Sequence, residues 1–285
     1  MWVYLNQQFV EDDKARISVF DRGFLFGDGI FETLRIYNGQ ALFLDQHLQR
    51  LRQSCDLLGI CLPTPEPAWE KLLQELIERN RLEHTLIRIT ISRGVGGVSP
   101  DPSDCANPTI VIFPRPLPQL TKDQKKHGVS LTILNTRRQP SSALPSQVKS
   151  LNYLNNILAK QEAIRAHTFD GILLNTDGHI AECTTSNVFF VKDQRLHTPS
   201  LQCEILPGIT REIVLQLAKK ERIDAQEGTY RPEDLWDADE MFLTNSGFGV
   251  LPVGTIETRP LASSRERSMT KTIQHLYEKF ISESF

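Results

Sequence analysis

The stretch FPRPLPQL, residues 113–120, carries three prolines in eight positions. Proline lacks a backbone N–H and has a fixed φ, so this density predicts a segment outside helices and central strands. We therefore expect a proline-rich linker at residues 116–122, between a small α/β domain at residues 1–115 and a larger domain at residues 123–285. The chain of 285 residues is long enough for two such domains.

On the amino-terminal side of the linker, the pattern predicts short strands and two helices. Apolar residues recur at helical spacing from Asp45, a suitable N-cap, to Gly59, a residue typical of a helix end. A second apolar stripe predicts a helix at residues 67–81. The runs LIRITIS, from residue 86, and TIVIF, from residue 109, are typical of strands.

On the carboxyl-terminal side, strands and helices also mix. We expect strands at residues 129–135, 171–175 and 183–191, a turn at residues 176–178, and helices at residues 151–167, 209–222 and near the carboxyl terminus. This mixture indicates the α+β class, with two domains and a cleft between them.

The composition excludes several classes of partner. A net charge of −3 with scattered basic residues argues against binding to nucleic acid or to an anionic membrane. No apolar run is long enough to span a bilayer and no secretory leader is visible, so we expect a cytoplasmic protein. The five cysteines lack metal or redox spacing, which favours reduced structural thiols, and no metal site is expected. Gly27 and Gly29 lack the third glycine of a dinucleotide fingerprint and favour a tight turn.

Lys149 stands in QVKSLNY, residues 147–153, just before an apolar stretch. A single lysine is usually a solvated surface residue, so a catalytic role for Lys149 needs support from the residues around it. A pyridoxal 5'-phosphate (PLP) enzyme needs an amine for a Schiff base, a carboxylate for the pyridine nitrogen and donors for the phosphate. Lys149 could supply the amine. Glu182 lies among small and hydroxyl residues, where burying a carboxylate is costly without a cationic partner, although it could also be a charge at a strand edge.

Two further segments could supply donors for a phosphate. LPGITR, residues 206–211, opens a predicted helix, and the N–H groups of Ile209 and Thr210 at its positive end suit an anion. An ordinary threonine in a first helical turn is the alternative. Arg50 could add a forked donor or could face solvent.

Taken together, these segments resemble the class IV aminotransferase family of PLP enzymes, fold type IV. The resemblance extends over nearly the whole chain through five segments, residues 21–33, 47–51, 149–152, 182–187 and 207–211. It implies a two-domain α+β enzyme with a small amino-terminal α/β domain and a larger domain built on a barrel-like sheet. It also implies PLP as cofactor and assembly as a homodimer.

The resemblance assigns a role to each matched residue. Lys149 would form the Schiff base and act as the general base, with a pKa below its usual value. Glu182 would pair with the pyridine nitrogen, and Tyr153 would lie near the phenolic oxygen. The phosphate would be bound by Arg50, Ile209, Thr210 and Ser246. The substrate would contact Phe31, Arg35, Arg88 and Gly247.

The subfamily is decided by smaller differences. Branched-chain aminotransferases are matched at Tyr153, Arg35 and Arg88. At position 86, however, this chain has leucine where those enzymes have tyrosine. VGGV at residues 95–98 lacks the carboxylate trap of D-amino-acid aminotransferases, and SRGVGG at residues 92–97 resembles the glycine loop of aminodeoxychorismate lyases.

The favoured function is transfer of an amino group between a small amino acid, branched-chain-like or D, and a 2-oxo acid such as 2-oxoglutarate. The alternative is an aminodeoxychorismate lyase that releases pyruvate and forms 4-aminobenzoate. A PLP-binding protein without catalysis is the third hypothesis.

Overall fold

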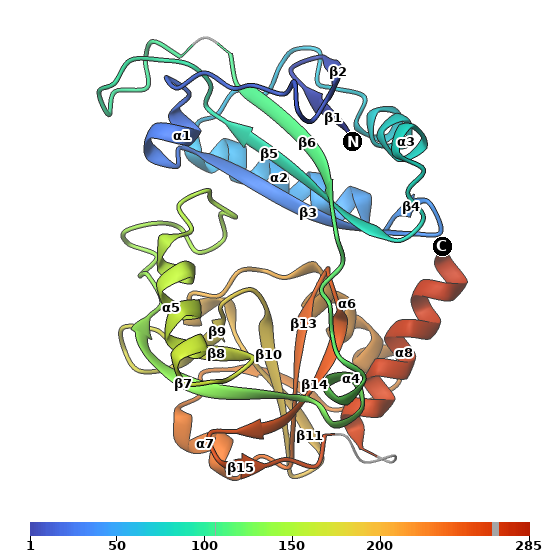
Figure 1. Cartoon of the computed structure of the whole chain (residues 1–285). Coiled ribbons are helices and arrows are strands. Elements are labelled where there is room, and N and C mark those ends of the chain that lie inside the picture. The colour runs from blue at the N-terminus through green and yellow to red at the C-terminus, as the bar shows by residue number, and fades with distance from the viewer. Residues whose placement is uncertain (106, 264–267) are drawn as a thin grey trace. The chain divides into compact units, whose positions relative to one another are not determined.

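The computed structural model describes residues 1–105, 107–263 and 268–285 and divides into two compact units (Figure 1). Unit 1 comprises Met1–Leu117, Val148–Tyr153 and Phe285, and unit 2 comprises Pro118–Gln147 and Leu154–Ser284. The first crossing from one unit to the other falls between Leu117 and Pro118. Residues 148–153, which the sequence placed in the larger domain, belong to unit 1 because they pair with one of its strands.

Unit 1 is a six-stranded antiparallel sheet with three helices. Its strands follow the spatial order β2-β1-β6-β5-β3-β4. The strands are β1 Trp2–Leu5, β2 Gln8–Glu11, β3 Gly29–Tyr37, β4 Gln40–Ala41, β5 Thr85–Ser92 and β6 Thr109–Arg115, and the helices are α1 Arg22–Phe26, α2 Leu44–Leu58 and α3 Trp69–Asn80.

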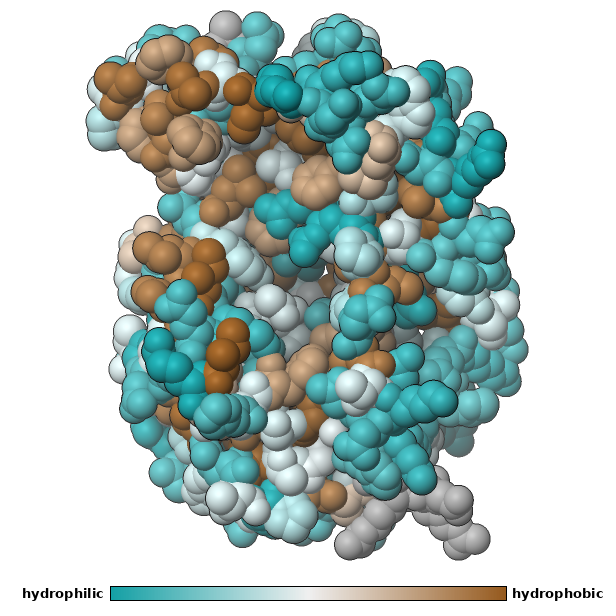
Figure 2. All heavy atoms as spheres, viewed as in Figure 1, coloured by the Kyte–Doolittle hydropathy of each residue, from teal (hydrophilic) through white to brown (hydrophobic). Residues whose placement is uncertain are grey.

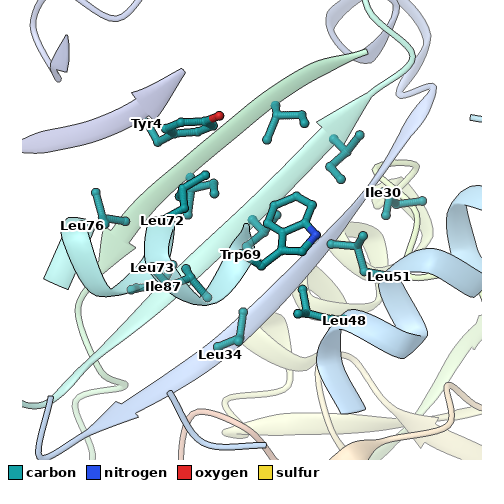
Figure 3. Packing of buried hydrophobic residues seen from close by; sticks show 14 of the residues in the cluster. Tyr4, Ile30, Leu34, Leu48, Leu51, Trp69, Leu72, Leu73, Leu76 and Ile87 are labelled. Atoms are coloured by element: carbon teal, nitrogen blue, oxygen red, sulfur yellow. The ribbon is translucent and has the colours of Figure 1, made fainter. Parts of the chain in front are cut away.

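The core of unit 1 lies between one face of this sheet and helices α2 and α3 (Figure 3). Side chains alternate along a strand, so every second residue of β3 and β5 faces the helices. The apolar stripes predicted for the two helices are confirmed, because their members pack against those strand residues, all of them buried except Leu58, which is partly buried. The core residues labelled in Figure 3 are Tyr4, Ile30, Leu34, Leu48, Leu51, Trp69, Leu72, Leu73, Leu76 and Ile87.

Two of the predicted turn and cap residues are confirmed, and one is wrong. Gly59 ends α2 in the left-handed region, and Gly27 does the same for α1 with φ 67°, which confirms the tight turn there. Asp45 is not the N-cap of α2. The helix begins at Leu44 after Phe43, so Asp45 lies in the first turn, where a carboxylate still interacts favourably with the helix dipole.

The prediction that residues 113–120 lie wholly outside a central strand is wrong for the first three. Strand β6 runs on through Phe113, Pro114 and Arg115, and Pro114 pairs with Ile87 of β5. On its other side β6 pairs with β1 only at Val111 and Ile112. Pro114 therefore lies beyond that pairing, where a missing N–H breaks no ladder hydrogen bond.

Unit 2 contains a nine-stranded mixed sheet with the order β12-β11-β10-β13-β14-β7-β8-β9, and β15 pairs with β14. Its strands are β7 Val129–Arg137, β8 Asp170–Leu174, β9 Ile180–Cys183, β10 Asn187–Lys192, β11 Arg195–Pro199, β12 Ala225–Gly228, β13 Glu240–Asn245, β14 Gly249–Ile256 and β15 Arg259–Pro260. The N–H of Ile180 in β9 donates to the carbonyl of Tyr230, two residues beyond β12, at 2.8 Å. Opposite ends of the strand order therefore approach each other, which gives the curled, barrel-like sheet that was predicted.

The helices of unit 2 are α4 Lys122–His127, α5 Leu154–Arg165, α6 Ile209–Lys220, α7 Pro232–Trp236 and α8 Met269–Ser284, with a short 3-10 turn at Leu201–Cys203. Helix α5 begins three residues later than predicted. Leu151 does not begin the helix as predicted, because its N–H donates to the Gly29 carbonyl of β3.

Two further observations bear on chemistry. All five cysteines are free, and no group of three metal-ligating side chains occurs in the described residues. Within the same residues, no helix combines the length and the apolar character that crossing a membrane requires.

Candidate active site

Lys149 lies on an extended segment that runs antiparallel to β3. The N–H of Phe31 donates to the Lys149 carbonyl, and the N–H of Leu151 donates to the Gly29 carbonyl, both at 2.9 Å. This pairing sets Lys149 on the same face of the sheet as Phe31. Its Nζ lies 4.7 Å from the centre of the Phe31 ring. The lysine is thus held on unit 1 by backbone hydrogen bonds on both sides.

The same face of the sheet carries the predicted substrate residues. Phe31 and Arg35 lie on β3, while Arg88 of β5 stands opposite Thr33, so all three point away from the helices. The Arg88 guanidinium carbon lies 3.7 Å from the centre of the Phe31 ring. The Tyr153 ring meets Phe31 edge-on at 5.4 Å. Unit 1 therefore gathers Lys149, Tyr153, Phe31 and Arg88 on one face, with Arg35 farther along the same strand.

The two arginines on this face can bind an anion. Burial, together with the charge of Arg115, lowers the pKa of Arg88 to about 10, so Arg88 stays charged at neutral pH. The Nε of Arg35 is buried and has no hydrogen-bond partner. A buried donor without a partner is costly, and a bound carboxylate would satisfy it.

Arg50 is buried and does not face solvent. It lies on α2 with its Nε 2.7 Å from Oε1 and its Nη2 2.8 Å from Oε2 of Glu32. His47 contacts the same carboxylate. No sequence motif predicted a role for Glu32 or His47. The signal that could have found them was a charged residue at an inward-facing position of an apolar strand, between Ile30 and Leu34.

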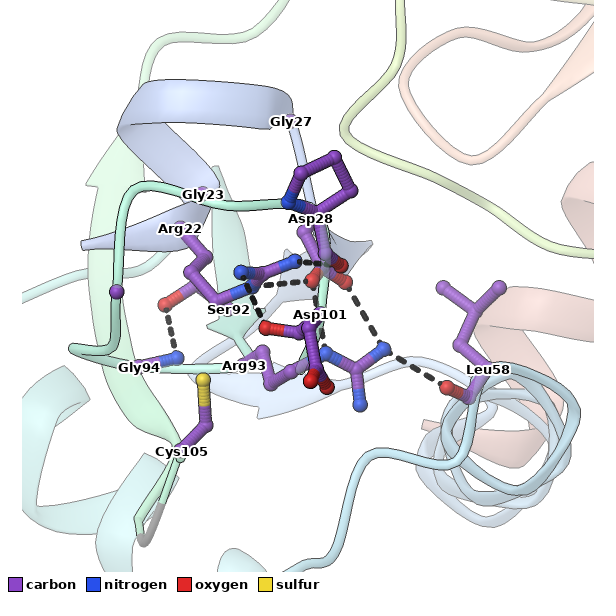
Figure 4. A network of polar contacts seen from close by, with 12 residues as sticks. Arg22, Gly23, Gly27, Asp28, Leu58, Ser92, Arg93, Gly94, Asp101 and Cys105 are labelled. Carbon is purple, nitrogen blue, oxygen red and sulfur yellow. Dashed lines mark hydrogen bonds and ion pairs between the residues drawn. The ribbon is translucent and has the colours of Figure 1, made fainter. Parts of the chain in front are cut away.

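Ion pairs hold the loop at residues 93–101, which contains the segment that differs between the subfamilies (Figure 4). Asp28 accepts hydrogen bonds from both Arg22 and Arg93 at 2.7–3.0 Å. Arg22 also donates to the carbonyls of residues 99–101, and Arg93 donates to that of Leu58. Burial alone would raise the pKa of Asp28, but Arg93 and Arg22 outweigh it and hold that pKa below its usual value. The ionised Asp28 therefore ties both ends of residues 93–101 to the turn before β3.

In unit 2, Glu182 has the cationic partner that its burial requires. The Nη2 of Arg138 lies 3.2 Å from Oε1 of Glu182. Oε2 accepts hydrogen bonds from Asn187 Nδ2 at 3.2 Å and from the Leu206 N–H at 3.0 Å. No sequence motif predicted a role for Arg138, which directly follows strand β7. Its contact with Glu182 of β9 forms only in the folded chain.

The start of helix α6 has no side-chain cap. Gly208 is the N-cap and provides no side-chain hydrogen bond, so Ile209 and Thr210 occupy an uncapped first turn. A Cβ at Gly208 would lie 1.9 Å from Asn187 Oδ1, so a side chain there would displace the Asn187 amide. Asn187 thereby connects the Glu182 carboxylate with the beginning of this helix.

Two buried hydroxyls of unit 2 have no hydrogen-bond partner, that of Ser186, just before β10, and that of Thr244 on β13. Thr244 pairs with Asn187 across strands β10 and β13. Ser246 and Gly247 follow in the turn after β13, where Asn245 Oδ1 accepts from the Gly247 N–H at 2.8 Å. A carboxylate–guanidinium pair, an uncapped helix start and two unsatisfied hydroxyls form a set of polar groups that fits a phosphorylated pyridine.

Comparisons with known proteins agree with this chemistry. Residues 29–256 match the family model for amino-transferase class IV. The chain is 38% identical over 280 residues to a protein assigned as a branched-chain-amino-acid aminotransferase from Methanocaldococcus jannaschii, covering 98% of this chain and 95% of that protein. It is 34% identical to the aminodeoxychorismate lyase of Bacillus subtilis, covering 98% and 94%. It is 32% identical to the D-alanine aminotransferase of Bacillus licheniformis, covering 96% and 95%.

Solved structures show the same relationship. The branched-chain amino acid aminotransferase of Escherichia coli matches with a TM-score of 0.90 at 27% identity, covering 96% of this chain and 92% of that one. The branched-chain amino acid aminotransferase of T.th., solved with N-(5'-phosphopyridoxyl)-L-glutamate, matches with a TM-score of 0.90 at 25% identity, covering 100% and 95%.

Proposed function

The chain belongs to aminotransferase class IV, and from this membership we propose that it transfers an amino group between a small amino acid and a 2-oxo acid such as 2-oxoglutarate. The predicted family, its PLP-dependent enzyme class and fold type IV are confirmed by the family match and the structural neighbours. One observation carries the proposed reaction. Lys149 Nζ lies over Phe31 on the sheet face that also presents Arg88 and Arg35.

We assign the cofactor contacts residue by residue. When bound, pyridoxal phosphate supplies an aldehyde that reacts with amines and a ring that draws electrons from the substrate Cα. Lys149 Nζ would hold the cofactor covalently and, as a free amine, would move the substrate's proton as general base. Glu182, which Arg138 contacts, would keep the pyridine nitrogen protonated. Tyr153 would contact the phenolic oxygen, and Arg50, Ile209, Thr210 and Ser246 would bind the phosphate.

The substrate contacts follow from the charges on the Lys149 face. Arg88 is charged and Arg35 has an unsatisfied Nε, so both suit the carboxylates of an amino acid or of a 2-oxo diacid. Phe31 offers an apolar surface beside the reacting amine. Gly247, in the turn after β13, would contact the substrate through its backbone.

The lyase is the second candidate, because the Bacillus subtilis aminodeoxychorismate lyase is 34% identical over 281 residues. Product analysis separates the two reactions. We expect incubation with L-leucine, L-valine, D-alanine or L-alanine and 2-oxoglutarate to give the matching 2-oxo acid in at least one case. Release of pyruvate from aminodeoxychorismate without any 2-oxo acid acceptor would instead establish the lyase. A yellow protein whose spectrum responds to no amine would be a binding protein without catalysis.

The covalent attachment has its own test. Borohydride reduction of the purified protein, followed by peptide mass mapping, should place a pyridoxyl group on Lys149. A tag on another lysine would contradict the assignment.

We further propose that the protein forms a homodimer through an exposed apolar patch of unit 1. The patch surrounds α1, and the isolated bridge between Asp21 and Val95 joins its two segments. Figure 2 shows it as a brown area over α1. A contiguous apolar surface of this kind is unusual for a monomer. Its members are Ile17, Val19, Phe20, Phe24, Leu25, Phe26, Val95 and Val98, which are 37–69% exposed.

Replacing Phe24 with aspartate should dissociate this dimer. Phe24 is 69% exposed in the single chain, so its loss leaves the fold of unit 1 unchanged. A two-fold interface contains the substitution twice, and at ~1.5 kcal/mol for each lost side chain the dissociation constant should rise about a hundredfold. Sedimentation velocity measures the change. Trp236→Asp, at an exposed apolar residue of α7, is the matched control and should leave the association unchanged.

A further inference from the structure

A charged cluster lies inside the apolar core of unit 1. Glu32 of β3 is 1% exposed, and His47 and Arg50 of α2 are 1% and 8% exposed. Both carboxylate oxygens of Glu32 bind the Arg50 guanidinium, at 2.7 and 2.8 Å. His47 Nδ1 lies 2.8 Å from Oε2 of the same carboxylate. Two of the three guanidinium nitrogens are thus held in one plane by Glu32.

The protonation states in this cluster follow from its surroundings. Burial alone would raise the pKa of Glu32, but the charge of Arg50 and hydrogen bonds from Arg50 and His47 hold it far below its usual range. Burial lowers the pKa of His47, despite the opposing effect of Glu32. An ionised carboxylate only accepts hydrogen bonds, so the neutral His47 carries its proton on Nδ1 and donates it to Glu32. The cluster therefore has one anion, one cation and one neutral donor.

Stability does not explain this arrangement. The neighbouring inward positions of β3 are Ile30 and Leu34, and those of α2 include Leu48 and Leu51, all in one hydrophobic core. A buried ion pair is generally no more stable than well-packed apolar side chains in its place. What the pair does provide is a fixed direction for the guanidinium. Because Nε and Nη2 are bound to Glu32, the direction in which Nη1 points is determined as well.

The cluster also lies close to Lys149. Glu32 follows Phe31 on β3, and the Phe31 N–H donates to the Lys149 carbonyl. The Lys149 charge contributes to lowering the pKa of His47. Arg50 is thus held from the strand that also holds the lysine, so the two groups are positioned by adjacent residues of one element.

We propose that Glu32 and His47 are positioning residues that orient Arg50 for the cofactor phosphate, and that they thereby make the protein prefer pyridoxal phosphate over unphosphorylated pyridoxal. This inference rests on the proposed function, in which Arg50 binds the phosphate. It assigns to Glu32 an effect that acts only through Arg50 and concerns only the phosphate end of the cofactor.

The test measures dissociation constants of the full-length chain, freed of cofactor, for pyridoxal phosphate and for pyridoxal. Both are titrated by absorbance and tryptophan fluorescence. In Glu32→Gln, we expect the constant for pyridoxal phosphate to rise about tenfold, as for loss of a charged hydrogen bond. The constant for pyridoxal should change less than about twofold, since it has no phosphate for Arg50 to bind.

A double-mutant cycle shows whether Glu32 acts through Arg50. In an Arg50→Gln background, Glu32→Gln should no longer change the ratio of the two constants. His47→Leu, like Glu32→Gln, should lower the preference for pyridoxal phosphate over pyridoxal. His47→Asn keeps a donor near the Nδ1 position and should therefore retain that preference. Should Glu32→Gln not fold, the two His47 variants decide the question. Glu240→Gln is the matched control, because Glu240 is a buried carboxylate of unit 2 that accepts from the Met269 and Thr270 N–H groups.

Each outcome has one meaning. Equal weakening of both ligands in the Glu32 and His47 variants would show general disruption of unit 1 and overturn the inference. An unchanged ratio would overturn it too, while the proposed function would stand if the unaltered protein still preferred the phosphorylated aldehyde. If the unaltered protein bound neither aldehyde, the proposed function itself would fail.

Discussion

Replacing Lys149 with alanine is expected to lower turnover by about 10³-fold or more, because a positioned general acid–base group alone contributes about 10²–10⁴-fold. The covalent attachment of the cofactor would be lost at the same time. The chain should stay folded. The backbone hydrogen bonds to Phe31 and Gly29 do not depend on the side chain, so we expect a change in unfolding free energy of about 1 kcal/mol or less.

Three measurements check this prediction. Turnover is followed with the amino acid found active, the visible spectrum reports the attached cofactor, and thermal unfolding reports the fold. Lys219→Ala, at an exposed lysine of helix α6, is the matched control and should behave like the unaltered protein. Retained turnover in Lys149→Ala, with the fold intact, would exclude Lys149 as the catalytic amine.

Replacing Glu182 with glutamine should slow turnover by about 10²–10³-fold, the range for loss of one preorganised electrostatic partner. The amide is nearly isosteric and its oxygen can still accept from Asn187 Nδ2 and the Leu206 N–H. It has no negative charge, so it cannot keep a proton on the pyridine nitrogen, and it leaves Arg138 without its carboxylate. We therefore expect the cofactor to remain bound while proton transfer becomes slow.

Single-turnover absorbance separates these two effects, because cofactor binding and the subsequent spectral change are recorded in one experiment. Glu240→Gln serves as the control for a buried carboxylate of the same unit. Full loss of cofactor from Glu182→Gln would mean that Glu182 acts mainly in binding. An unchanged rate would mean that it has no part in the proton transfer.

Structural features that depend on local spacing could be predicted well. The apolar stripe of α3, from Trp69 to Ile77, is set by the helical period and is buried throughout. Gly59 ends α2 as predicted, and Gly27 forms the predicted tight turn, because glycine adopts positive φ at no steric cost. The start of α6 at Ile209 follows from the same kind of local signal.

Features that depend on distant residues could not be predicted. Asp45 was a suitable N-cap by type, yet Phe43 takes that position. Pro114 was excluded from a central strand, yet β1 ends before reaching it. In both cases the preference of the residue was correct in general, and the neighbouring chain decided the outcome.

The sequence by itself determined the residue types that a PLP site needs and their order along the chain, because those are properties of single residues and short motifs. Only the tertiary structure decided which of them act together. It paired the Lys149 segment with β3, placed Arg138 against Glu182, and buried Glu32 and His47 against Arg50. These contacts join residues far apart in the chain, and strand register and helix packing, which no local pattern encodes, determine where their side chains point.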